Sequence, residues 1–157
     1  MIFGLQHKSM ASDKNFFLIM GALSSAAAAI AHLGCIVYGA DWYRFFGAGE
    51  QMALMAEQGS SYPTVVTSII VLILALWCLY ALSGARIILR LPLLRLGLCV
   101  IAFVYLLRGV AFVGIMHLFP DNSLSFWLVS SGICFSIGCL YAIGTYQSWE
   151  ILGAKKT

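Results

Sequence analysis

Residues 62–83 read YPTVVTSIIVLILALWCLYALS and contain no charged side chain. A helix of this length is about 33 Å long, which is enough to cross the roughly 30 Å hydrocarbon core of a bilayer. Inside that core every backbone N–H and C=O group needs a partner within the chain, and a helix provides one for each. The stretch therefore predicts a membrane-spanning α-helix.

Three further apolar stretches of similar length flank this one, at residues 16–39, 91–118 and 124–146. The 157-residue chain is 62% hydrophobic and only 10% charged, with a mean hydropathy of +0.95. Soluble domains carry about a quarter charged residues, so this chain has too few charges to cover a surface in water. We therefore expect an all-α, polytopic membrane protein in which residues 1–157 form a single domain, a bundle of four transmembrane helices.

Charged residues are distributed unequally between the two sides of this predicted bundle. The two tails and the connection between the second and third spans carry the basic residues Lys8, Lys14, Arg86, Arg90, Arg95, Lys155 and Lys156. The two opposite connections carry one basic residue and four acidic ones, namely Arg44, Asp41, Glu50, Glu57 and Asp121. Because an excess of Lys and Arg marks cytoplasmic loops, we predict an inner (plasma) membrane protein with both termini in the cytoplasm.

The connection between the first two spans, residues 40–61, is longer than the two to eight residues usual between packed helices. It opens with aromatic residues, Trp42 and Tyr43 among them, placed around Arg44. Such aromatic residues are enriched where the membrane meets water. The loop is therefore expected at the outer surface of the membrane.

The second half of this loop has the pattern of a short amphipathic helix. Ala48, Met52 and Met55 would share one helical face, while Glu50 and Glu57 would lie on the opposite face. We expect a short helix that lies on the outer membrane surface and covers the bundle.

Ionisable side chains inside membrane spans are costly and often mark function. His32 lies about six residues before the outer end of the first span, and Arg108 lies one or two turns below His117 in the third. We therefore expect His32 and Arg108 at similar depth beneath the aromatic loop. The guanidinium of Arg108 would pair with Glu50, reach lipid headgroups or bind an anionic ligand, and His32 would bind the ligand or only a neighbouring helix.

The favoured hypothesis is a non-enzymatic binding or accessory protein. It would hold a lipid, a quinone-like molecule or a partner's helix near the outer leaflet, with membrane lipids and a second copy or another membrane protein as partners. The candidate ligand-binding residues are His32, Trp42, Tyr43, Arg44, Glu50, Tyr105, Arg108 and His117.

Two other hypotheses remain open. The first is a membrane enzyme or redox subunit that uses His32 as an acid/base or cofactor ligand, joined by His117 at a haem or by Glu50 and His117 at zinc. The second is a homo-oligomeric transporter that associates through the small residues at 21–31. No nucleophile motif, phosphate-binding fingerprint or metal-ligand spacing is present, so we expect no catalytic residue, metal or cofactor. Scattered basic residues argue against a nucleic-acid partner.

The sequence Cys-Leu-Tyr-Ala occurs twice, at residues 78–81 and 139–142. Both copies lie near the cytoplasmic end of a predicted span. Either an internal duplication or chance in an apolar sequence would account for it.

Overall fold

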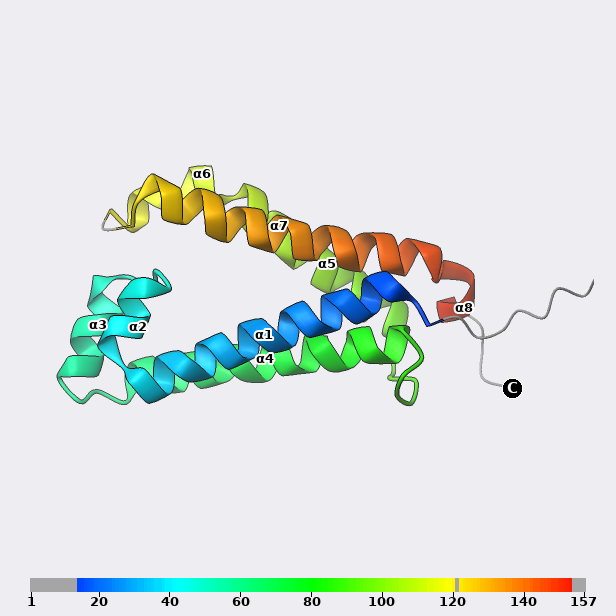
Figure 1. Cartoon of the computed structure of the whole chain (residues 1–157), viewed down its shortest axis with the longest axis horizontal. Coiled ribbons are helices and arrows are strands. Elements are labelled where there is room, and N and C mark those ends of the chain that lie inside the picture. The colour runs from blue at the N-terminus through cyan, green and yellow to red at the C-terminus, as the bar shows by residue number, and fades with distance from the viewer. Residues whose placement is uncertain (1–13, 121, 154–157) are drawn as a thin grey trace, which may run out of the picture.

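The computed structural model describes residues 14–120 and 122–153, and within them the chain forms helices and no β-strand. The long helices run beside one another in one elongated bundle (Figure 1). They are α1 (Phe16–Tyr38), α4 (Tyr62–Gly84), α5 (Leu94–Val110) and α7 (Leu124–Gln147). The short helices α2 (Ala40–Phe45) and α3 (Glu50–Glu57) lie at one end, here called the α3 end, and α8 (Trp149–Gly153) lies at the other, the α8 end.

Three helices, α1, α4 and α7, are long and apolar enough to cross a membrane. Only 17% of the apolar part of α4 is buried inside the molecule, and the corresponding share is 28% for α1 and for α7. Most of the apolar side chains therefore face outward, which a surface in water would not tolerate. These helices indicate a membrane protein.

These three helices begin and end within one residue of the predicted bounds, and local signals mark their starts. The Asn15 side chain accepts a hydrogen bond from the Leu18 N–H at the start of α1, and Ser123 caps α7 in the same way. Pro63 lies in the first turn of α4, where a backbone N–H would have no partner within the helix, so its missing N–H costs nothing. The predicted bounds rest on the apolar stretches, which are likewise a local property of the sequence.

The third predicted span, 91–118, was wrong as one continuous helix. The helix α5 begins only at Leu94, because Pro92 disfavours helical backbone at Leu91 and Leu93 has a left-handed backbone with a φ of 50°. At Ala111 the chain breaks, and α6 (Phe112–Ile115) with the following 3-10 turn η1 (Met116–Leu118) bends away by 57°. Glycines on both sides of the break, and a Gly114 N–H that bonds to the Ala111 carbonyl, favour this tighter turn over a straight helix. A fourth crossing exists only if this bent pair forms one span.

The bundle is built from two closely packed helix pairs, α1 with α4 and α5 with α7. In the second pair the backbones nearly touch, because an added Cβ at Gly109 would lie 2.9 Å from the Phe135 backbone, and one at Gly138 would lie 2.9 Å from the Leu106 nitrogen. The two pairs meet near the α8 end, where Gly21 lies against Tyr141. They diverge toward the α3 end (Figure 1).

The two Cys-Leu-Tyr-Ala segments have different surroundings. Tyr141 is fully buried between helices, whereas Tyr80 is half-buried and donates a hydrogen bond to the Pro92 carbonyl at 3.2 Å. Shared sequence therefore does not correspond to a shared structural role.

Candidate functional site

A chain of hydrogen bonds joins all four long helices at the level where the helix pairs meet. The Ser25 hydroxyl of α1 lies 3.1 Å from the Tyr105 hydroxyl of α5 and 2.8 Å from the Tyr141 hydroxyl of α7. Tyr141 in turn donates to the backbone carbonyl of Trp77 on α4 at 3.0 Å. All three hydroxyl-bearing residues are buried.

The Trp77 carbonyl, which can only accept, determines which hydroxyl donates in each of these hydrogen bonds. Tyr141 has a single hydroxyl proton, which it gives to the Trp77 carbonyl, so Ser25 must donate to Tyr141. Ser25 then has no proton left, and Tyr105 must donate to Ser25. Every hydroxyl proton of the network is therefore used within it.

His32 and Arg108 both lie on the α3 side of this network. His32 is seven residues beyond Ser25 on α1, about 10 Å along the same helical face, and Arg108 is three residues beyond Tyr105 on α5, about 5 Å. Both side chains are half-buried. No hydrogen bond joins these two described residues. The helix pairs diverge on this side of the network (Figure 1).

The guanidinium of Arg108 lies against α7. Its Nη1 donates to the Ser131 hydroxyl at 3.3 Å, and its Cζ lies 5.3 Å from the centre of the Trp127 ring. Among the described residues Arg108 has no carboxylate partner. Trp127 and Ser131 are both buried, and the indole N–H of Trp127 has no hydrogen-bond partner there. The site therefore holds a charge and a donor that its described neighbours do not fully satisfy.

His32 has one ring nitrogen committed and one available. Its Nδ1 lies 2.7 Å from the Ala28 carbonyl, which can only accept, so Nδ1 carries a proton. In the neutral ring Nε2 is then a hydrogen-bond acceptor. His32 thus keeps an acceptor, and Arg108 keeps charged donors beyond its bond to Ser131.

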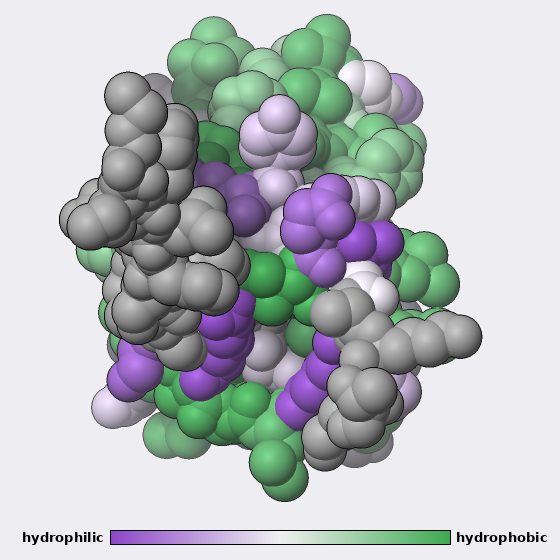
Figure 2. All heavy atoms as spheres, turned by 90° about the vertical axis from the view of Figure 1, so that its right-hand side faces the viewer, coloured by the Kyte–Doolittle hydropathy of each residue, from purple (hydrophilic) through white to green (hydrophobic). Residues whose placement is uncertain are grey.

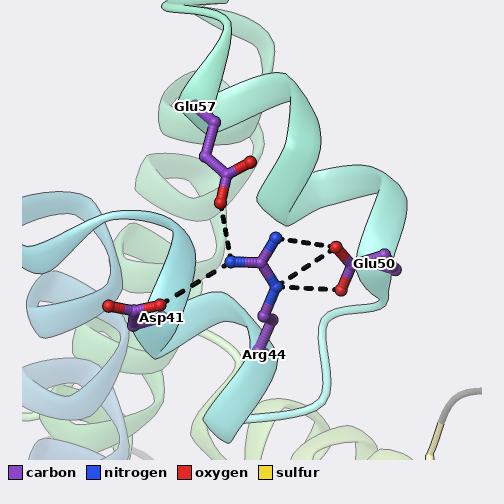
Figure 3. Close-up of polar contacts among 4 residues, drawn as sticks. All are labelled: Asp41, Arg44, Glu50 and Glu57. Carbon is purple, nitrogen blue, oxygen red and sulfur yellow. Dashed lines mark hydrogen bonds and ion pairs between the residues drawn. The ribbon is translucent and has the colours of Figure 1, made fainter.

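Glu50 does not pair with Arg108, because it is committed to Arg44 (Figure 3). Arg44 donates from Nη2 to Glu50 at 2.7 Å and from Nη1 to Glu57 at 2.7 Å, and Asp41 lies 3.6 Å away. The hydrogen bonds from Arg44 lower the pKa of the Glu50 carboxyl, and the bonds to Glu50 and then Glu57 raise the pKa of Arg44. This cluster ties α2 to α3 and leaves Arg108 without the expected carboxylate.

Trp42 and Tyr43 anchor the cap formed by α2 and α3. Tyr43 is buried and accepts a hydrogen bond from Thr67 of α4 at 3.2 Å. Trp42 lies against Gly34 of α1, where an added Cβ would come within 2.2 Å of the indole ring. Both aromatic side chains thus hold the cap on the α1–α4 pair, a more specific task than anchoring at the membrane surface.

Tyr105 and His117 have opposite surroundings. Tyr105 is buried in the hydrogen-bond network, whereas His117 is exposed on η1 beyond the bend. His117 therefore does not lie in line above Arg108, as a straight third span would require. Among the described residues no three His, Cys, Asp or Glu side chains come together as a metal site, so the zinc arrangement has no support.

A hollow of about 340 Å³ lies at the α3 end, between α3 and residues 118–120 and 122. Met52, Met55 and Phe119 give it apolar walls, while Glu50 and Asn122 add polar groups. Asn122 also donates to the Gly47 carbonyl at 3.1 Å, which joins the cap to the α5–α7 pair. The sequence placed both connections on the same side of the bundle but did not predict this contact.

Sequence reasoning also missed Ser25, Trp127, Ser131 and Tyr141. Each is a polar side chain inside an apolar stretch, and that was the available signal. It was too common to use alone, since many Ser, Thr and Tyr residues lie in the same stretches. Only the packing of the helices shows which of them meet.

No protein-family model, no curated protein and no solved structure matches the chain. The apolar helices and their outward-facing side chains define its class as an α-helical membrane protein.

Proposed function

We propose that the chain crosses the inner membrane four times, with α5, α6 and η1 together forming the third crossing and both termini in the cytoplasm. The basic residues Lys14, Arg86, Arg90 and Arg95 gather at the α8 end, which supports a cytoplasmic position for that end. The α3 end, where Arg44 is surrounded by carboxylates, would then face outward, with α2 and α3 covering the outer end of the bundle.

Within this topology, the protein is a non-enzymatic binding protein for an amphipathic molecule, a lipid or a quinone-like compound, held near the outer leaflet. One observation carries the proposal. Arg108 lies within a membrane segment, and among the described residues its hydrogen-bond partner is the neutral hydroxyl of Ser131. A guanidinium in such a place requires further acceptors, and a phosphate, carboxylate or carbonyl oxygen of a ligand would supply them.

The surroundings of Arg108 favour an elongated ligand with one polar end. The exposed face of α5 next to it is apolar, with Val104 and Leu107 at 38% and 49% exposure. The buried indole N–H of Trp127 would give a second donor to the ligand's oxygen, and Nε2 of His32 would accept from a hydroxyl. The ligand's tail would follow the diverging helix pairs into the lipid.

The test measures which molecules stay with the protein after purification in a mild detergent. Lipids and quinones are extracted from wild type and from Arg108→Gln, and each is counted per protein by mass spectrometry. We expect the variant to lose a stoichiometric species that wild type keeps and Arg108→Lys partly keeps. Ser136→Ala, on the exposed face of α7, is the control and should retain the species.

If Arg108→Gln folds and retains the same complement as wild type, the proposal is wrong. Folding is checked by the gel-filtration profile and helical circular dichroism. If a second protein co-purifies in stoichiometric amount and no small molecule does, a partner's helix, and not a lipid or quinone, fills the site.

A further inference from the structure

Basic side chains gather at the α8 end from three parts of the chain. Lys14 precedes α1, Arg86 and Arg90 lie in the 85–93 loop after α4, and Arg95 lies in the first turn of α5. Figure 2 looks onto this end and shows hydrophilic residues grouped on it, with hydrophobic residues toward the edges. The orientation of a protein in the membrane depends on basic residues lying on one side. It does not require basic residues from separate segments to lie close together, as they do here.

These four residues line three adjoining hollows. The first, of about 220 Å³, has Lys14 and Arg86 in its walls; the second, of about 270 Å³, has Arg86 and Arg90. The third, of about 590 Å³, has Arg90 and Arg95. Because neighbouring hollows share an arginine, the cations lie along one groove, here called the basic groove. Glu150, the acidic residue of α8, lines none of the three.

Two of the arginines are held in place by α8. Arg90 donates from Nη2 to the Leu152 carbonyl, and Arg95 donates from Nε and Nη2 to the Trp149 carbonyl at 3.0 and 2.5 Å. Arg95 also lies 4.5 Å above the Trp149 ring. A guanidinium has five N–H donors, so Arg95 keeps donors for another oxygen after these bonds. The groove is therefore positioned before any ligand arrives.

The loop between the arginines presents apolar side chains outward. Ile87, Ile88 and Leu89 follow Arg86 directly, and Leu89 is 85% exposed. Leu93, after Arg90, is 75% exposed. Exposing these apolar side chains to water is unfavourable. If the loop lies at the level of the lipid headgroups, they would instead contact the acyl chains. Because basic residues alternate with exposed apolar side chains in this loop, a lipid fits the groove better than a water-soluble anion does.

We propose that the basic groove binds the headgroups of anionic phospholipids from the adjacent leaflet. Lys14, Arg86, Arg90 and Arg95 would contact the phosphodiester oxygens, and the tips of the 85–93 loop would contact the acyl chains. Arginine suits this task because its planar fork matches a phosphate in geometry and charge. The proposal requires membrane insertion but not a ligand at Arg108, which lies toward the other end of the bundle.

The test is native mass spectrometry of the full-length protein in a neutral detergent. Phosphatidylglycerol and phosphatidylcholine with the same acyl chains are added at equal concentrations, and glycerol 3-phosphate is added in a separate arm. Wild type should bind phosphatidylglycerol preferentially and glycerol 3-phosphate negligibly. Each cation removed should weaken phosphatidylglycerol binding about fivefold, so Lys14→Gln/Arg86→Gln should weaken it about twenty-five-fold.

The variants avoid Arg90 and Arg95, because those two residues also hold α8. Arg86→Lys, which keeps the charge, should retain most of the preference, and Arg44→Gln at the α3 end should retain all of it. Equal binding of the two lipids by wild type would overturn the proposal, as would a folded double variant with an unchanged preference. Equal binding of glycerol 3-phosphate would show a site for a soluble anion instead. Should the double variant fail to fold, Arg86→Gln alone is compared with Arg86→Lys.

Discussion

The hydroxyl oxygens of Ser25 and Tyr141 lie 2.8 Å apart and join α1 to α7 at the level where the two helix pairs meet. Ser25 donates in this bond, because the single proton of Tyr141 goes to the Trp77 carbonyl. The contact is fully buried, with both residues 0% exposed. It marks the point from which the pairs diverge toward His32 and Arg108, so the candidate site depends on it.

Replacing Ser25 with alanine should destabilise the bundle by about 1 kcal/mol. The substitution removes the bonds to both Tyr105 and Tyr141. Tyr141 keeps its bond to the Trp77 carbonyl, whereas the Tyr105 hydroxyl loses its acceptor. The measurement is the unfolding free energy from denaturing-detergent titration. Ser136→Ala is the matched control: Ser136 is exposed on α7 and bonds to the Gly132 carbonyl of its own helix, so its loss should change little. Equal effects at the two serines would contradict this account of the network.

Replacing Gly109 with alanine should destabilise the protein by about 1–3 kcal/mol, because the new methyl group would lie 2.9 Å from the Phe135 backbone. Gly138→Ala should act similarly from the facing helix, against Leu106. Gly132→Ala on α7 is the control, since an added Cβ there meets nothing within 4 Å and alanine favours a helix over glycine. The same titration measures all three. A Gly109→Ala protein as stable as Gly132→Ala would show that α5 and α7 do not pack this closely.

The α2–α3 cap should loosen in acid. Hydrogen bonds from Arg44 hold the pKa of Glu50 below its usual value of about 4.3, so the detached cap binds more protons than the closed one as the pH falls below that value. The stabilisation is complete above about pH 4.3 and is lost as the pH falls through the lowered pKa. Hydrogen exchange of the amides at 42–58, corrected for the intrinsic pH dependence, measures it.

Glu50→Gln serves as the control for that titration. Its cap should exchange faster at neutral pH and show a smaller further change in the acid window, because the titrating carboxylate is gone. An acid step of the same size and midpoint in Glu50→Gln would assign the effect to another group.

The proposed orientation predicts which positions a membrane-impermeant thiol reagent can reach in intact cells. In a background without the five native cysteines, a cysteine at Ser60, beyond α3, should be labelled from outside. One at Glu150, on α8, should be labelled only after the membrane is opened; both positions are exposed in the folded protein. The reverse pattern would invert the topology and place Arg108 in the inner leaflet.

Much of the fold could be read from the sequence because the signals involved are local. The apolar run at 62–83 and the caps at Asn15 and Ser123 are properties of neighbouring residues, and α1, α4 and α7 follow them. The third span was less predictable. Its apolar run continues across Ala111, and composition alone does not show that the helix breaks there.

The candidate site was only partly predictable for a different reason. His32 and Arg108 stand out because charged or titratable groups are rare inside apolar runs. The partner of Arg108 does not stand out, because a serine such as Ser131 is common in such runs. The sequence suggested Glu50 for this role, but in the structure Glu50 lies against Arg44, six residues away in the same connection.

The sequence by itself determined that the chain forms long apolar helices and which ionisable groups lie within them. Hydrophobicity and helix length are sums over neighbouring residues, so no knowledge of packing is needed. Only the tertiary structure decided that Ser25 meets Tyr105 and Tyr141, that Arg108 rests on Trp127, and that basic residues from three segments line one groove. Those contacts depend on which helix faces approach closely, and glycines such as Gly109 and Gly138 set that approach through backbone packing between residues distant in the chain.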